Sequence, residues 1–245
     1  MSMGSPATTR RTGARLTGRP EHVWLPVMHQ NWLEISFLHW PVDSAVLQSR
    51  LPPGLVIDTF EQSAWVGLTP FHLTGLRPPG LPPIPWLSAF PEMNLRTYVT
   101  GPAGPGIWFF SLDAASAPAV LGARLTYGLP YHWATMRIGV TGNRTHYTST
   151  RKDARAAITV AVGERITQPG ALILFLTERY RLYSRILGGL AMAAVEHEPW
   201  PLQQATLVSL EETVRRAAGL PDDTAPPLVH YSPGVRVRVG APRLL

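Results

Sequence analysis

Residues 90–99 read FPEMNLRTYV, and this stretch decides the expected fold. Successive side chains of a β-strand point to opposite faces, so the pattern places Glu92, Asn94 and Arg96 on one face. The other face is largely apolar, with Met93 and Leu95 at its centre. Three polar groups beside such an apolar face are expected where a strand lines the inside of a barrel.

Strand signals of this kind recur along the chain, separated by short turns rich in proline and glycine. The expected strands are Leu33–Trp40, Leu55–Phe60, Ala64–Leu73, Met93–Thr100, Ile107–Leu112, Tyr131–Val140, Thr145–Arg151, Ala156–Val162, Tyr180–Arg185, Ala191–Glu196, Ala205–Ser209, Leu228–Tyr231 and Val235–Val239. The expected helices are Asp43–Arg50, Ala115–Thr126, Gly170–Glu178 and Leu210–Ala218. The chain has many expected strands, few short helices and no regular alternation of strand and helix. This predicts a mainly β domain with a few short helices (α+β), built as an antiparallel barrel. A barrel of this size can hold a small ligand inside.

Composition limits the partners of the chain. The 245 residues are 45% apolar and carry a net charge of +6. Residues 1–20 hold four arginines and no acid, so we expect a disordered basic tail followed by one nearly neutral domain over residues 21–245. Nucleic acid is therefore not an expected partner, and no apolar run is long enough for a membrane span. No secretory signal precedes the domain, so we expect a cytoplasmic protein. The oligomeric state stays open, a homo-oligomer included.

The common catalytic motifs are absent. The sequence has no phosphate-binding glycine loop, no Gly-x-Ser-x-Gly elbow and no cysteine. Its eight histidines lack chelating spacing, so we expect no metal and no cofactor.

Two stretches carry candidate site residues. In residues 90–99, Arg96 could bind a carboxylate and Glu92 could exchange protons, with Asn94 beside them. The alternatives are that Glu92 and Arg96 satisfy each other, or that their face is solvated. Residues 123–133 read ARLTYGLPYHW, where a helix end and a turn bring Arg124, Tyr131 and His132 together. These could supply an anion anchor, a hydrogen-bond donor and a base, or form a buried aromatic girdle with one satisfied histidine.

Two further polar stretches have a structural interpretation. Glu178 is expected to form an ion pair with Arg179 or Arg181. His197 is expected to satisfy the backbone of a rigid turn rather than to bind a ligand.

Several motifs occur in one order that is specific to a known family. They are LHWPV at 38–42, LPPGL at 51–55, AWVG at 64–67, the pattern ExNxRTYV at 92–99, FSLDA at 110–114, FLTERY at 175–180 and HYSPGV at 230–235. Between Trp24 and Val239 the chain resembles the uncharacterised YqjF-like family, which is grouped by fold with acetoacetate decarboxylase. The resemblance implies a cone-like antiparallel β-barrel with an internal ligand cavity.

One departure from the acetoacetate decarboxylase signature bears on the chemistry. That signature reads Arg-Glu-x-x-Gly-[FY]-Pro-Lys-Lys, and its first lysine forms an imine with the keto acid. Residues 124–132 resemble it, but Tyr131 and His132 stand in place of the two lysines. Tyrosine has no amine, and the chain's single lysine, Lys152, is expected in an exposed turn with an ordinary pKa. Imine chemistry is therefore not expected.

These features predict a protein with a pocket that binds a small carbonyl or carboxylate compound. If it is an enzyme, Glu92, Tyr131 and His132 are the catalytic candidates, and Arg96, Arg124 and Asn94 bind the substrate. Enolisation, dehydration, cyclisation and hydrolysis fit, which makes the chemistry lyase-like, isomerase-like or hydrolase-like. The alternative is a binding or sensing module that uses the same barrel only to hold a ligand.

Overall fold

The structure, a computed structural model, describes residues 22–222 and 225–245. The predicted tail at residues 1–20 lies outside them. The strands are β1 (Pro26–Val42), β2 (Val56–Ile57), β3 (Ala64–Arg77), β4 (Phe90–Gly101), β5 (Gly104–Ala114), β6 (Tyr131–Trp133), β7 (Thr135–Thr141), β8 (Arg144–Thr150), β9 (Arg155–Arg165), β10 (Arg181–Ile186), β11 (Gly189–His197), β12 (Gln203–Glu212), β13 (Leu228–Gly240) and β14 (Arg243–Leu244). The helices are α1 (Ser44–Gln48), α2 (Ala117–Tyr127), α3 (Ala171–Thr177) and α4 (Val214–Ala217). No helix in the described part of the chain is long and apolar enough to cross a membrane.

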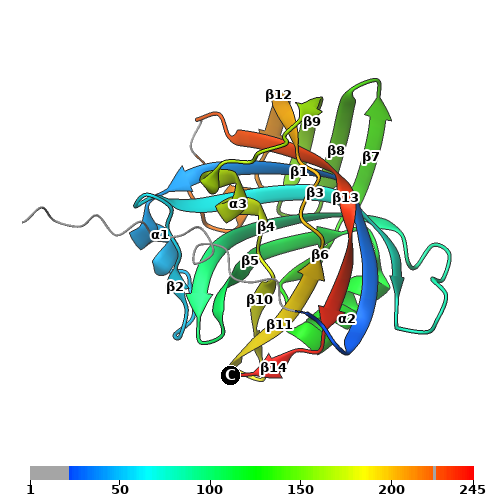
Figure 1. Ribbon diagram of the computed structural model, residues 1–245, viewed down its shortest axis with the longest axis vertical. Helices are drawn as coiled ribbons and strands as arrows, with labels where there is room; N and C mark the ends of the chain where they lie inside the picture. The colour runs from blue at the N-terminus through cyan, green and yellow to red at the C-terminus, as the bar shows by residue number, and fades with distance from the viewer. Residues whose placement is uncertain (1–21, 223–224) are drawn as a thin grey trace, which may run out of the picture.

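Seven strands close into a barrel in the order β11-β10-β5-β4-β3-β1-β13 (Figure 1). Closure comes from β13 pairing with β11, where Val195, Glu196 and His197 face Val239, Arg238 and Val237. This pairing leaves no free sheet edge where the two strands meet. The prediction of a mainly β barrel is confirmed, although two pairings, β10 with β5 and β5 with β6, are parallel.

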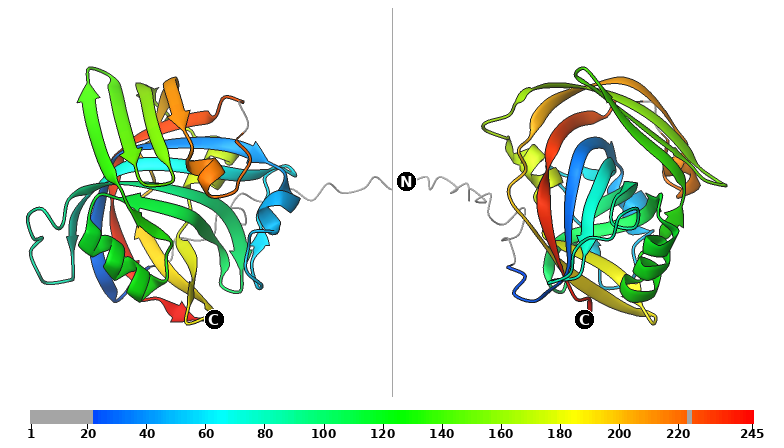
Figure 2. Two further views of the ribbon diagram at one scale, coloured as in Figure 1. Left: turned by 180° about the vertical axis from the view of Figure 1, so that it is seen from behind. Right: turned by 90° about the vertical axis from the view of Figure 1, so that its right-hand side faces the viewer.

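A second layer extends the sheet beyond the barrel. Strands β12, β9, β8 and β7 continue from β13 and stand away from the barrel in both views of Figure 2. A separate apolar cluster that includes Trp40, Tyr147 and Ile158 lies under this extension. The barrel keeps its own core around Phe37, Phe71 and Val237.

Helix α2 forms where the sequence predicts one. The Ser116 side chain accepts a hydrogen bond from the amide of Ala119 as its N-cap, and Pro118 sits in the first turn. Gly128 ends the helix with a left-handed φ of 62°, and a Cβ there would lie 2.0 Å from the Arg185 carbonyl oxygen. Only glycine fits this turn, which leads the chain directly into β6.

The predicted hairpin of Leu55–Phe60 with Ala64–Leu73 is wrong. Strand β2 keeps only two residues and pairs with β4, not with β3. Glu61 and Gln62 both have positive φ values, the geometry of a tight two-residue turn, and this turn carries a single bridge, between Phe60 and Ser63. The short segment then lies along β4, where the Asp58 amide donates to the Tyr98 carbonyl.

Two other boundaries also differ. The predicted helix Leu210–Ala218 is strand up to Glu212, because residues 210–212 pair with β9. The helix shrinks to Val214–Ala217, with the Glu212 carboxylate accepting from the Arg215 amide. The predicted strand Tyr131–Val140 is two strands, interrupted at residue 134.

Candidate functional site

The barrel encloses a cavity of about 570 Å³. Side chains from β1, β3, β4, β5, β6, β10, β11 and β13 line it, together with one face of α2 and the loop at residues 78–88. Ligand sites for drug-sized molecules span roughly 300–1,000 Å³. The interior therefore has the size of a small-molecule site.

Strand β4 supplies the polar face that the sequence predicts. Glu92, Asn94 and Arg96 all line the cavity and are 4%, 6% and 4% exposed. Each has a buried polar atom without a partner, namely Glu92 Oε2, Asn94 Oδ1 and Arg96 Nε. Buried polar atoms in native proteins are usually hydrogen-bonded, so three on one strand face mark this wall as unusual. The alternative of a solvated face does not hold.

Glu92 and Tyr131 form the one direct hydrogen bond between predicted site residues in the cavity. The Tyr131 hydroxyl donates to Glu92 Oε1 at 3.0 Å. Burial raises the pKa of Glu92 to about 8, and the Tyr131 hydrogen bond offsets part of that rise. Burial also raises the pKa of Tyr131 well above its usual value, and the neighbouring Glu92 adds to the rise. Both groups are therefore mainly protonated at neutral pH.

Arg96 is a buried cation that no carboxylate of the described residues compensates. Its Nη2 donates to the Leu176 carbonyl at 3.3 Å, and its guanidinium lies 5.5 Å from the centre of the Phe37 ring. Within residues 22–222 and 225–245, no carboxylate forms an ion pair with it. The predicted alternative of a Glu92–Arg96 pair is therefore not what the structure contains. A buried charge without a partner is costly, so an anion from solution would be stabilised here.

Three cavity residues beyond the predicted set surround this polar end, namely Thr177, Arg179 and His197. Arg179 forms its ion pair with Asp58, at 2.7 Å, so Arg179 is not the partner in the predicted pairing of Glu178 with Arg179 or Arg181. His197 Nδ1 lies 2.7 Å from the Glu198 carbonyl, which agrees with the predicted backbone role. Burial lowers the pKa of His197 below its usual value, so its ring is mainly neutral.

His132 lies on the other side of β6 and does not line the cavity. In the parallel pairing of β5 with β6, Tyr131 is beside the cavity residue Leu112 and His132 is beside Asp113. Consecutive residues of a strand face opposite ways, which separates the two side chains. Burial lowers the pKa of His132, and the Arg151 charge lowers it further. This placement does not support its predicted role as a base beside Tyr131.

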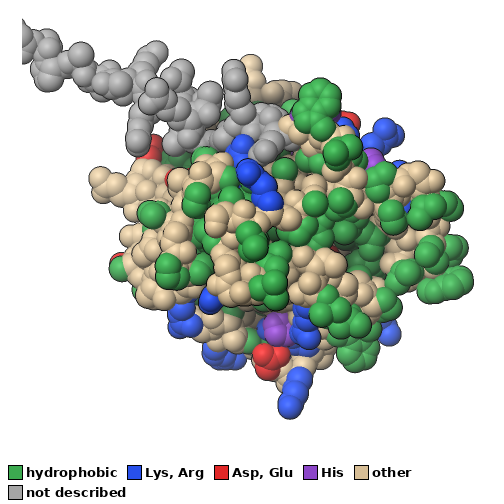
Figure 3. Space-filling view, turned by 90° about the horizontal axis from the view of Figure 1, so that it is seen from below, with side chains coloured by type: hydrophobic (Ala, Val, Ile, Leu, Met, Phe, Trp, Pro, Cys, Tyr) green, Lys and Arg blue, Asp and Glu red, His purple; other side chains and the backbone are tan. Residues whose placement is uncertain are grey.

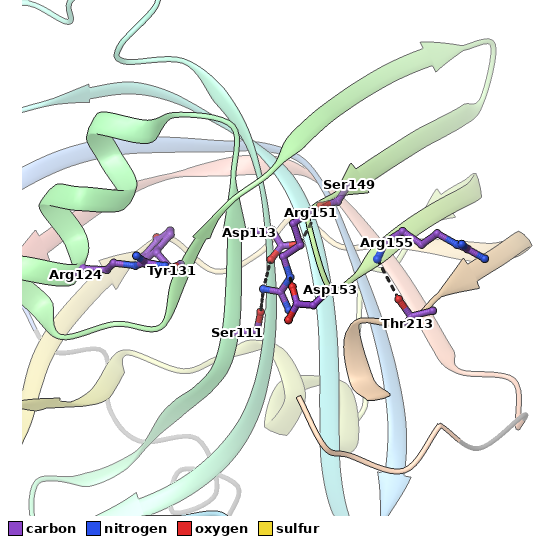
Figure 4. Close-up of polar contacts among 9 residues, drawn as sticks. All are labelled: Ser111, Asp113, Arg124, Tyr131, Ser149, Arg151, Asp153, Arg155 and Thr213. Atoms are coloured by element: carbon purple, nitrogen blue, oxygen red, sulfur yellow. Dashed lines mark hydrogen bonds and ion pairs between the residues drawn. The ribbon is translucent and has the colours of Figure 1, made fainter. Parts of the chain in front are cut away.

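On the side of β6 where His132 lies, Asp113 and Arg151 form a buried ion-pair network (Figure 4). Asp113 accepts from Arg151 Nη1 at 2.8 Å and from the Ser149 hydroxyl at 2.9 Å, and Arg151 also donates to Ser111. The Asp113 and Arg151 side chains are 1% and 4% exposed. The network joins β5 to the end of β8 and acts as a structural clamp.

Arg124 is exposed on α2 and also lies outside the cavity lining. Its Nε donates to the Tyr131 backbone carbonyl at 2.6 Å, as Figure 4 shows. The predicted proximity of the two residues is present, but Arg124 holds the backbone of β6 instead of reaching a ligand. Within the described ranges, no three His, Asp or Glu side chains lie close enough together to hold a metal ion.

Residues 29–236 match the family DUF2071, described as an uncharacterized conserved protein. The chain belongs to this family. It is 42% identical over 218 residues to the uncharacterized protein YqjF of Bacillus subtilis. The aligned region covers 87% of this chain and 89% of that protein. The resemblance drawn from the sequence motifs is therefore confirmed.

Solved structures of the acetoacetate decarboxylase type share the fold of this DUF2071 chain. Acetoacetate decarboxylase of Legionella pneumophila superposes with a TM-score of 0.65 at 12% identity and covers 98% of each chain. The enduracididine biosynthesis enzyme MppR complexed with pyruvate gives 0.63 at 15% identity, with 90% of each chain covered. At such low identity the likeness establishes the barrel and no activity.

Proposed function

We propose that the cavity binds a small carbonyl or carboxylate compound and moves a proton on it without forming an imine. The observation that carries the proposal is that Glu92, Asn94 and Arg96 line one cavity and each keeps a buried polar atom without a partner. An unsatisfied buried group costs about 1–3 kcal/mol. A ligand with an anionic group for Arg96 and an acceptor for the proton of Glu92 removes part of this cost, and the hydroxyl of an enol formed from it can donate to Asn94 Oδ1.

Arg96 is the anchor in this proposal. A guanidinium can hold a carboxylate through two parallel hydrogen bonds, which orients it as well as binding it. Asn94 lies between Arg96 and Glu92 along β4, so a ligand that is anchored at Arg96 and extends along the strand passes Asn94 before it reaches Glu92. A carbonyl next to the carboxylate is then the first group of the ligand on the side of Asn94.

Glu92 is the proton donor and acceptor. Its pKa of about 8 keeps most of it protonated at neutral pH while leaving a usable fraction ionised. An acid or base with a pKa close to the working pH is the most effective in general acid–base catalysis. The Tyr131 hydroxyl holds one carboxyl oxygen and leaves Oε2 without a partner. Enolisation next to a carbonyl is the simplest reaction these groups support.

The imine route of acetoacetate decarboxylase needs an amine, and the described lining of the cavity contains no lysine. Lys152, the only lysine of the chain, is exposed in the turn between β8 and β9. MppR holds pyruvate, a 2-oxo acid, in the same type of barrel. This supports 2-oxo acids as the first compounds to test.

Hydrogen–deuterium exchange tests the proposal. Pyruvate and 2-oxooctanoate are incubated with the protein in D2O, and loss of the C3 proton signals is followed by NMR. We expect exchange above the buffer rate that falls by about 100-fold or more in Glu92→Gln. Glu164→Gln, which changes an exposed glutamate far from the cavity, should match the wild type. Binding without exchange would reject the catalytic step and leave a ligand-binding module, and no binding of either acid would reject the proposal.

A further inference from the structure

The two ends of the cavity differ in polarity, and β4 runs from one to the other. Phe90, Glu92, Asn94 and Arg96 follow one another along its inner face. At about 3.3 Å per residue, Phe90 and Arg96 are roughly 20 Å apart. The polar groups thus lie deep in the barrel, and the end near the loop at residues 78–88 begins with an aromatic side chain.

The mouth of the cavity is lined by apolar side chains that reach into solvent. Leu81 and Ile84 of the loop between β3 and β4 line it and are 59% and 52% exposed. This loop projects from the barrel on the side where α2 lies (Figure 2, left). Hydrophobic side chains gather on the right-hand part of the face seen from below (Figure 3). Contiguous exposed apolar surface of this kind marks ligand grooves and interaction sites.

Small residues on α2 keep the opposite wall of the mouth open. Ala119, Gly122 and Ala123 line the cavity from one side of the helix. A Cβ built at Gly122 meets no atom within 4 Å. A channel whose walls are mainly apolar, with Gln30, Arg77 and Ser88 also in its lining, therefore leads from solvent toward Glu92 and Arg96.

We infer that the compound this cavity takes is an amphiphile, a medium-chain carboxylate or 2-oxo acid with its head at Arg96 and its tail between Leu81 and Gly122. The inference rests on the proposed function, because it uses the same anchor, and it adds the substrate class. A two- or three-carbon acid would satisfy Arg96 but leave the apolar part of a 570 Å³ cavity filled with water. An apolar tail would displace this water and bury the apolar side chains that line the rest of the cavity.

Chain length is the direct test. Calorimetric titrations of the full chain with butanoate, hexanoate, octanoate and decanoate should show Kd falling by roughly fourfold for each added methylene, until the tail reaches solvent. 1-Decanol, which has the tail without the charge, should bind at least tenfold more weakly than decanoate. A Kd that does not change with chain length overturns the inference.

Two variants separate head from tail. Gly122→Phe places a ring in the open space of the mouth, so it should weaken decanoate at least tenfold and leave butanoate unchanged. Leu121→Phe is the matched control, because this neighbouring side chain is 59% exposed and does not line the cavity. Arg96→Met should weaken every acid of the series. If Arg96→Met weakens butanoate and decanoate equally but chain length has no effect, the tail is wrong and the proposed function stands; if no acid depends on Arg96, the proposed function itself fails.

Discussion

Replacing Glu92 by glutamine changes how the stability of the protein depends on pH. Glu92 is 4% exposed, and burial raises its pKa from 4.5 to about 8. Glutamine keeps the shape of the side chain and still accepts the Tyr131 hydroxyl, but it cannot ionise. The variant therefore isolates the free energy of ionising one buried carboxyl.

The sign follows from proton binding. Between pH 4.5 and about 8 the unfolded chain has lost this proton while the folded chain keeps it, so the folded state binds more protons. The free energy of unfolding then falls as pH rises, by about 1.4 kcal/mol per pH unit within the window. The stabilisation from this group is complete below pH 4.5 and is lost as pH rises through about 8. From pH 6 to pH 8 the wild type should lose about 2 kcal/mol more stability than Glu92→Gln.

Urea unfolding followed by tryptophan fluorescence measures this difference. The chain has eight tryptophans, and the described ones include the buried Trp40 and Trp200. Other groups titrate in both proteins, so the quantity to compare is wild type minus variant at pH 6, 7 and 8. Glu164→Gln, at an exposed site, is the control for exchanging a glutamate for a glutamine. A difference between wild type and Glu92→Gln that does not change with pH would refute the buried, protonated state of Glu92.

Three further perturbations follow from the same contacts. Tyr131→Phe removes the hydrogen bond that lowers the pKa of Glu92, so the pH-dependent difference measured by urea unfolding should move to higher pH; a move to lower pH would contradict it. Arg96→Met removes a buried cation that no carboxylate of the described residues compensates. The free energy of unfolding should stay equal or rise by about 1 kcal/mol, and carboxylate binding measured by calorimetry should be lost. A fall of several kcal/mol in the free energy of unfolding would show that Arg96 is structural. Arg151→Met leaves Asp113 buried at 1% exposure without its cation, so thermal and urea unfolding should show a loss of about 3 kcal/mol, and a near-neutral result would mean that Asp113 is protonated in the wild type.

The fold could be predicted because its main signals are local. Alternation along residues 90–99 placed three polar side chains on one face, and they do share the cavity wall. The cap, proline and glycine around α2 located the helix to within two residues at either end. These patterns report on backbone geometry within a few residues, which is what a sequence shows most directly.

Pairing between distant strands was harder to predict. The turn after residue 60 looked like a hairpin, but the partner of β2 is β4, some forty residues away. The pairing of β11 with β13 closes the barrel, and His197 and Arg179 lie at the polar end of its cavity. No local sequence pattern predicts that position. The sequence around these two residues predicts only structural roles, an ion pair of Glu178 and a rigid turn at His197.

The separation of Tyr131 and His132 could have been predicted. Adjacent positions in an expected strand face opposite sides, and the same alternation that grouped Glu92 with Arg96 divides this pair. The helix end and the turn before Tyr131 do bring the two residues close along the chain, but closeness along a strand does not put their side chains on one face. The parallel pairing with β5 places only Tyr131 on the cavity side.

The central claim is that Arg96, deep in the barrel, receives the anionic group of a ligand. Crystals soaked with 4-bromobenzoate test it directly, because the anomalous scattering of bromine locates the compound without bias. We predict a bromine peak inside the seven-stranded barrel, with the carboxylate oxygens about 2.9 Å from the Arg96 guanidinium and close to Asn94. A compound that binds in solution but whose bromine lies outside the barrel, with Arg96 untouched, would contradict the account.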